Sequence, residues 1–275
     1  MFNVKNIKPK IELREYVRKI SVFQSDSKLN FKHKLTPSAF TYLSYNHKDI
    51  PISYFGNKKV HPSGRLQIAG PKINEDIYVE YNGRLSQILV EFTASGFYYL
   101  FHHSPAMLSN CLTEINNFIL PNEYDRLEKI LLEITTAKKQ VKVLEEFLVD
   151  KSFKAIPPLD YIEKSLKIIE EHYGNVIVNK LAQEVGIGRR QFDRKFQEVV
   201  GVTPKYYSKI TQLNYVINLM AAKNYNSIQD LAFQAEYYDL SHFAHRFKEL
   251  TGLTPNEFVD SDQHIAMKYF DDLLK

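Results

Sequence analysis

Residues 181–258 contain one pattern twice. Each copy has a short apolar segment, a turn, two phenylalanines four positions apart and a Gly-x-Thr-Pro ending. Corresponding residues are 50 positions apart at Leu181 and Leu231 but 51 apart at Phe196 and Phe247, so the second turn holds one extra residue. Because a repeat builds the same supersecondary unit each time it occurs, it constrains the fold of this chain more than any other feature.

Each copy predicts two short helices joined by a tight turn. In the first copy, Leu181 and Ala182 begin an apolar face at helical spacing, and Gly186 follows where a chain leaves a helix with positive φ. Phe192 and Phe196 lie one helical turn apart and therefore face the same core. This order of elements is that of the helix-turn-helix motif, whose second helix enters the major groove of DNA.

The doubled motif resembles the DNA-binding domain of the bacterial AraC/XylS-type transcription regulators. The resemblance rests on both Gly-x-Thr-Pro endings and on three runs of the second copy: Asp239-Leu240-Ser241-His242-Phe243, Arg246-Phe247-Lys248 and Gly252-Leu253-Thr254-Pro255. It implies two helix-turn-helix units, at about 178–201 and 227–252, joined by one long helix expected from Pro204 to about Ala222. It further implies a sequence-specific transcription regulator that reads two adjacent major-groove segments of double-stranded DNA, and not an enzyme.

The resemblance also implies which side chains contact DNA. In the family, the exposed face of the second helix of each unit reads base edges; by position these residues are Arg190, Asp193, Arg194, Ser241, His242 and His245. Arginine is the usual bidentate partner of guanine, and aspartate can accept from cytosine. Arg189 and Lys209 are expected to add contacts to DNA. The alternative is a solvated charged face, or, for the two histidines, neutral contacts to phosphate.

Charge is distributed unevenly between the two copies. The chain has a formal net charge of +4. Six basic and two acidic residues give +4 within 186–209, whereas two basic and four acidic residues give −2 within 236–257. Attraction to DNA phosphates is therefore expected to rest mainly on the first copy.

Three residues depart from the family pattern. Glu236 occupies the position of Gly186, so a turn of the same shape would place a glutamate in the left-handed region. Gln212 replaces a common arginine of the connecting helix, and Val216 replaces an alanine. These changes leave the predicted fold intact and weaken the expected grip of the second unit on DNA.

Residues 39–92 have a pattern typical of short strands. Five runs rich in aromatic and β-branched residues, at 41–45, 50–55, 66–68, 77–81 and 86–92, are separated by glycine, proline and asparagine turn signals. Asn82-Gly83 between the last two runs predicts a β-hairpin. We expect a small antiparallel sheet or barrel plus helices, so the fold class is an α+β N-terminal domain followed by an all-α C-terminal domain.

Several helices are expected outside the strand region. Asn122 and Asp125 have capping-box spacing ahead of an apolar stripe. The other expected helices are 96–103, 138–150 and 159–173, and the tail, 261–275, is expected to pack back on the body. Residues 11–20 could form a short helix or a strand, with a weak preference for helix. Because Pro157-Pro158 cannot continue a helix, we place a regulatory or dimerisation domain at 1–155 and the DNA-binding domain at 156–275.

The N-terminal part resembles the sensor-type domain that precedes some AraC-type domains, through Ile88-Leu89-Val90-Glu91-Phe92 and the helical run at 96–101. This implies a regulatory role and leaves open a small-molecule effector, a homodimer and a contact with RNA polymerase. The aromatic residues of 40–101 could line an effector pocket or be core. The alternative function is a ligand-binding or enzymatic protein whose C-terminal helices are only structural.

Other kinds of site have little support. His102 and His103 are adjacent, so they point about 100° apart on a helix and suit no shared metal. Cys111 is the single cysteine, and no phosphate-binding loop or dinucleotide fingerprint is present. We expect no metal, no cofactor and no membrane span, and a cytoplasmic location, since a signal peptide is not visible.

Overall fold

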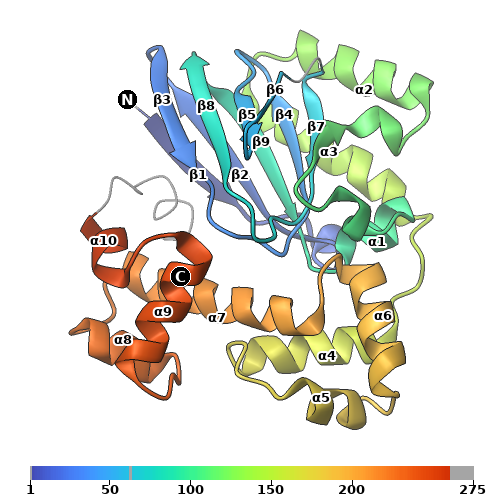
Figure 1. Cartoon of the computed structure of the whole chain (residues 1–275). Helices are drawn as coiled ribbons and strands as arrows, with labels where there is room; N and C mark the ends of the chain where they lie inside the picture. The colour runs from blue at the N-terminus through green and yellow to red at the C-terminus, as the bar shows by residue number, and fades with distance from the viewer. Residues whose placement is uncertain (1, 62–63, 261–275) are drawn as a thin grey trace. The chain divides into compact units, whose positions relative to one another are not determined.

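The computed structural model describes residues 2–61 and 64–260, so the expected packing of the tail, 261–275, lies outside the described residues. The chain divides into two compact units (Figure 1). The first contains residues up to 159 except 36–38, together with 197–202; the second contains 160–196, 203 onward and 36–38. The expected roles of 1–155 and 156–275 remain predictions.

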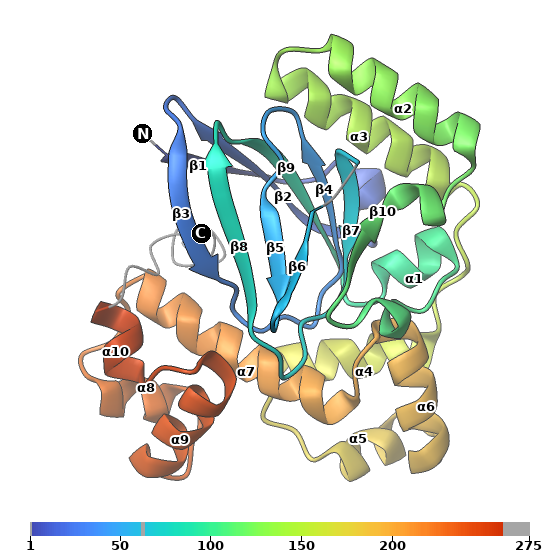
Figure 2. The same cartoon turned by 45° about the horizontal axis from the view of Figure 1, so that its top comes forward.

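The first unit contains two antiparallel sheets that face each other (Figure 2). The six-stranded sheet has the order β1-β2-β9-β4-β7-β10, and the four-stranded sheet has the order β3-β8-β5-β6. The strands are β1 (Phe2–Ile7), β2 (Val17–Ser25), β3 (Leu29–Lys34), β4 (Tyr42–Asn46), β5 (Ile52–Phe55), β6 (Lys58–Val60), β7 (Leu66–Ala69), β8 (Ile77–Gly83), β9 (Ser86–Phe92) and β10 (Leu112–Glu114). The expected α+β class of this part is confirmed.

The hydrophobic core of this unit lies between the six-stranded sheet and three helices. These are α1 (Gly96–Phe101), α2 (Pro121–Glu133) and α3 (Ala137–Ser152), with α2 and α3 side by side in Figures 1 and 2. Ile20, Leu43 and Val90 from the sheet and Leu131 and Leu144 from the helices belong to one buried cluster. Three short 3₁₀ turns, η1 (Ile11–Leu13), η2 (Pro105–Leu108) and η3 (Ile115–Asn117), complete the connections.

The opposite face of the six-stranded sheet is polar although it is buried. Side chains alternate between the two faces of a strand, so Ser21, Ser44, Gln67 and Glu91 point away from the helices and toward the four-stranded sheet. All four are less than a tenth exposed. Because buried polar groups need partners, Glu91 accepts from Arg18 at 2.6 Å, while Asn46 keeps one amide nitrogen without a partner.

Several expectations for the N-terminal part are wrong. Residues 11–20 do not form the weakly favoured helix: η1 is followed by β2, which lies between the preceding strand β1 and the distant strand β9. β1, β3, β6 and β10 were not expected. Asn82-Gly83 does not close a hairpin, because β8 pairs with β3 and β5 while β9 pairs with β2 and β4. The two-residue hairpin is at Gly56-Asn57, where Phe55 lies opposite Lys58.

The helix α2 begins differently from the expected capping box. Its N-cap is Leu120, and the carboxylate of Glu123 accepts from the Leu120 amide at 3.1 Å. Asn122 instead accepts from the neighbouring Glu123 amide. The helices expected at 96–103 and 138–150 are confirmed as α1 and α3.

The second unit is helical, as expected. It contains α4 (Asp160–Glu171), α5 (Val178–Glu184), α6 (Arg189–Val200), α7 (Pro204–Ala221), α8 (Ile228–Gln234), α9 (Leu240–Thr251) and α10 (Pro255–Asp260), of which the end of α6 is grouped with the first unit. Thr203 accepts from the Tyr206 amide and Pro204 occupies the first turn, which explains where α7 begins. None of the helices in the described part of the chain is long and apolar enough to cross a membrane.

Candidate nucleic-acid interface

The first helix-turn-helix unit consists of α5, a turn and α6. Gly186 has φ +73°, which a glycine adopts without strain, and the Ile187 amide donates to the Ala182 carbonyl at 3.1 Å. Ala182 is 1% exposed, and Phe192 and Phe196 are fully buried with their rings 5.6 Å apart. The buried face of α6 thereby fixes which of its side chains face outward.

The second helix-turn-helix unit consists of α8, a turn and α9, and it repeats this geometry. Tyr237 donates to the Ala232 carbonyl at 3.0 Å, the counterpart of the bond at Ile187, and Glu236 has φ +56°. The expectation of a left-handed glutamate is confirmed. Ser227 caps α8 by accepting from the Asp230 amide, and the carboxylate of Asp230 accepts from the Asn226 amide.

On α6, the predicted base-reading residues differ in how they are held. Arg190 and Arg194 are exposed. Asp193 is only partly exposed, and its Oδ2 accepts from Arg189 Nε at 2.7 Å. Arg189 also donates to Asn179. Asp193 and Arg189 therefore form a tied pair, while the two other arginines project outward.

On α9, the three predicted contacts are all exposed. Asp239 caps this helix by accepting from the His242 amide at 2.7 Å, which places Ser241 and His242 in its first turn. The His242 ring packs edge-on against Tyr237, and its Nε2 lies 3.5 Å from Arg246 Nε. His245 is exposed one turn further along. The N-terminal part of α9 is thus an exposed, weakly charged surface.

Lys209, expected to contact DNA, is engaged within the protein. Its Nζ lies 3.5 Å from Glu249 Oε1, so it joins α7 to α9. Burial alone would raise the pKa of Glu249, but Lys209 and Arg246 outweigh burial and hold this pKa below its usual range. A contact between Lys209 and phosphate would have to compete with this ion pair.

A family of helix-turn-helix domains matches residues 181–261, which cover both units. The chain carries an AraC-type helix-turn-helix domain. It is therefore a DNA-binding transcription regulator. The departures of this AraC-type domain from the family pattern have structural partners: Val216 is fully buried, and Gln212 donates to the Ala235 carbonyl at 2.8 Å.

Several solved structures are similar to this chain at low sequence identity. ToxT from Vibrio cholerae is 15% identical over 94% of this chain and 97% of its own, with a TM-score of 0.47. ToxT with a bound unsaturated fatty acid is 15% identical over 86% and 96%, with a TM-score of 0.46. The xylose-binding activator XylR is 21% identical over 44% and 37%, with a TM-score of 0.32. No curated protein matches. The AraC-type assignment rests on the family match and the two observed units.

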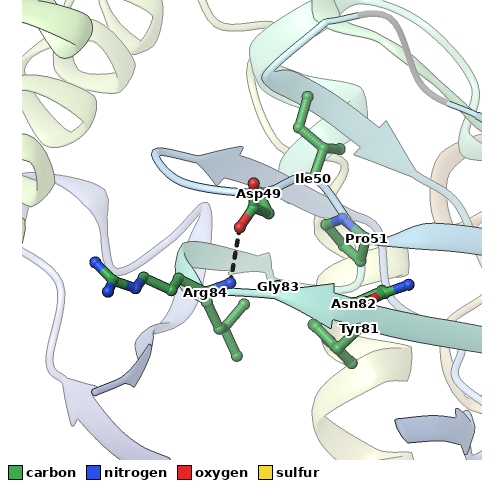
Figure 3. Close-up of a pocket in the computed structure, with 8 residues that line it drawn as sticks. Asp49, Ile50, Pro51, Tyr81, Asn82, Gly83 and Arg84 are labelled. Carbon is green, nitrogen blue, oxygen red and sulfur yellow. Dashed lines mark hydrogen bonds between the residues drawn. The ribbon is translucent and has the colours of Figure 1, made fainter. Parts of the chain in front are cut away.

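A pocket in the unit that contains the two β-sheets lies beside the connection between β8 and β9 (Figure 3). Its volume is about 190 Å³ including open solvent, and it is lined by Asp49, Ile50, Pro51, Tyr81, Asn82, Gly83, Arg84 and Leu85. Asp49 accepts from the Arg84 amide at 2.7 Å. Tyr81 is its one aromatic residue, so this pocket is not the aromatic-lined site considered from the sequence. Among residues 2–61 and 64–260, no three His, Cys, Asp or Glu side chains are grouped to hold a metal ion.

Proposed function

We propose that this regulator places α6 and α9 in two adjacent major-groove segments on one face of a DNA duplex. The observation that carries this proposal is the pair of helix-turn-helix units joined by the 18-residue α7. At about 1.5 Å per residue, α7 is roughly 27 Å long, close to the ~34 Å that separates successive major-groove segments. A rigid helix of this length would allow α6 and α9 to contact two segments of one DNA site.

The two readers are proposed to act differently. Arg190 and Arg194 are exposed on α6 and suit bidentate contacts to guanine. Asp193 reads cytosine only if it leaves Arg189, so the tied pair better supports a phosphate contact by Arg189, positioned by Asp193. Ser241, His242 and His245 supply hydrogen-bonding contacts to base edges from α9. Lys209 reaches phosphate only if it exchanges Glu249 for DNA.

The compact unit that contains the two β-sheets is proposed to modulate this binding to DNA. Its buried polar face between the sheets offers hydrogen-bonding groups that an apolar core would lack, and Asn46 has an amide nitrogen without a partner there. A small polar effector, a homodimer contact and a contact with RNA polymerase are the candidate routes. We propose that the chain acts in the cytoplasm and through binding rather than catalysis.

The test is a footprint of the full-length chain on a duplex selected from random DNA by the same protein. Two protected major-groove segments about 10 base pairs apart, from one protomer, are expected. The matched control is Arg190→Ala with Arg194→Ala, which should remove protection of one segment first. Protection of a single segment overturns the two-reader proposal, and failure to select any duplex favours a protein whose C-terminal helices are structural.

A further inference from the structure

The loop after α4 is pressed against α7. Tyr173 and Gly174 have φ +49° and +84°, and a Cβ on Gly174 would lie 2.1 Å from the Ser208 carbonyl oxygen of α7. The Tyr173 ring stacks on Tyr215 of α7, with centroids 4.0 Å apart and planes at 21°. This loop leads directly into α5, so its position sets where the first helix-turn-helix unit begins.

The turn between α8 and α9 is held by the same loop and by α7. Asn175 Nδ2 donates to Glu236 Oε2 at 2.6 Å, and Gln212 of α7 donates to the carbonyl of Ala235 at 2.8 Å. Burial raises the pKa of Tyr215, and Tyr173 and Glu236 add to this shift, which agrees with a carboxylate beside the two rings. We call Tyr173, Asn175, Gln212, Tyr215 and Glu236 the brace.

Two members of the brace have costly backbone conformations. Tyr173 and Glu236 are non-glycine residues in the left-handed region, where Cβ approaches a carbonyl oxygen. Glu236 also places its charge just beyond the C-terminal end of α8, where the helix dipole is unfavourable to an anion. A glycine there would avoid both costs but could not accept the hydrogen bond from Asn175. Strain of this kind persists where surrounding contacts determine the conformation, and it gathers at functional positions.

We propose that the brace fixes the orientation of α9 relative to α5 and α6, and so sets the number of base pairs between the two DNA segments that the regulator accepts. Asn175 lies three residues before α5, and Glu236 lies four residues before α9. Their hydrogen bond therefore connects the entrance of the first helix-turn-helix unit directly to the turn between α8 and α9 of the second, in addition to the connection through α7. The proposal rests on the two-segment reading proposed above.

The test measures tolerance to spacing. The probe is the duplex selected by the full-length wild-type chain, together with two derivatives that gain or lose one base pair between the protected segments. Because ~10.5 base pairs make one turn, one base pair changes the segment orientation by roughly 34°. We expect the wild type to lose affinity for both derivatives by about tenfold, comparable to one mismatched base pair. The affinity of Asn175→Ala for these derivatives should fall only about threefold, because α8 and α9 can then change orientation to follow the DNA.

Three further variants make the outcome specific. Glu236→Gly removes the acceptor while keeping an easy left-handed turn, so it should relax spacing like Asn175→Ala even if that variant folds poorly. Glu236→Gln keeps an acceptor oxygen and should discriminate like the wild type. Asn224→Ala, at an exposed position of the same unit, is the matched control and should also discriminate like the wild type.

The possible failures are distinguishable. If the wild type protects two segments and both Asn175→Ala and Glu236→Gly still discriminate tenfold, the brace does not set spacing and the inference is wrong while the proposed function stands. If the wild type protects one segment only, the proposed function fails and the brace has no spacing to set.

Discussion

In the first helix-turn-helix unit the turn after α5 is closed by Gly186, with φ +73°, whereas in the second the turn after α8 is closed by Glu236, with φ +56°. The chain leaves the first helix of each unit in the same way, and the equivalent bonds at Ile187 and Tyr237 have lengths of 3.1 and 3.0 Å. The charge differs: residues 186–209 carry +4 and residues 236–257 carry −2. Backbone geometry has been kept in both copies while charge has been concentrated in one.

This difference suggests a division of work between the copies. The first has exposed arginines and can attract phosphates, so most of the salt-dependent affinity should come from it. In the second, Glu249 forms ion pairs with Arg246 and with Lys209 of α7, and the surface near the N-terminus of α9 carries little charge. The second copy is therefore better suited to test the sequence and spacing of DNA than to hold it.

The largest expected effect tests whether the two cores are equivalent. Phe192 and Phe243 occupy corresponding positions and are both fully buried. Phe192→Ala and Phe243→Ala should each lower the free energy of unfolding by about 3–5 kcal/mol, from lost burial and a residual cavity. Urea unfolding followed by circular dichroism measures this. Phe233→Ala, at a side chain that is 81% exposed, is the control and should change stability by less than about 0.5 kcal/mol. A large difference between the two buried positions would show that the copies are not energetically equivalent.

The next effect separates the two surfaces. Arg194 and His245 correspond at an offset of 51 and are both exposed. Arg194→Ala should weaken binding to a selected duplex by about 1–3 kcal/mol and relax the base preference at one position, because a bidentate contact to guanine is lost. His245→Ala should cost less and leave the salt dependence unchanged. Competition binding at several salt concentrations measures both. If His245→Ala costs more, or Arg194→Ala weakens all sequences equally, the proposed division is wrong.

The repeat was predictable because its signals are local. The helical spacing of Leu181, Phe192 and Phe196 and the glycine at 186 each act within a few residues, and the structure confirms them. Even the left-handed Glu236 followed from its position in the pattern. The roles of side chains were less predictable, since Arg189–Asp193 and Lys209–Glu249 pair according to distances that depend on packing.

The N-terminal sheets were only partly predictable because strand pairing is non-local. The Asn82-Gly83 signal is typical of a hairpin, yet the two flanking strands belong to different sheets. Whether β8 and β9 pair with each other depends on where the neighbouring strands β2, β3, β4 and β5 lie. No local sequence pattern encodes those positions. Asn175 and Tyr173 were missed for a similar reason, because their partners are 61 and 42 positions away.

A smaller effect tests the acidic character of the second copy. The pKa of Glu249 is held below its usual range by Lys209 and Arg246, against the opposing effect of burial. A lowered folded-state pKa stabilises the protein above the ordinary pKa of glutamate, and this contribution is lost as the pH falls through the folded value. Wild type should therefore lose more stability between pH 6 and pH 4 than Glu249→Gln. Because Glu249 is 44% exposed, the difference should be under about 1 kcal/mol. Equal losses in urea unfolding would contradict the ion-pair contribution.

The smallest expected effect concerns the one residue that makes the two turns chemically different. Glu236→Gly relieves left-handed strain of about 1–2 kcal/mol. It also removes the hydrogen bond from Asn175, worth about 1 kcal/mol, and gives the unfolded chain about 0.4–1 kcal/mol of extra entropy. These contributions nearly cancel, so the free energy of unfolding should change by less than about 0.5 kcal/mol. Lys223→Gly is the matched control, because Lys223 is an exposed left-handed residue at the end of α7, with φ +53°. Lys223→Gly should raise the free energy of unfolding more than Glu236→Gly does, since it leaves the hydrogen bond between Asn175 and Glu236 intact. If the two variants gain equally in urea unfolding, the bond between Asn175 and Glu236 contributes no stability, and glutamate at this turn would need a reason found only in the DNA complex.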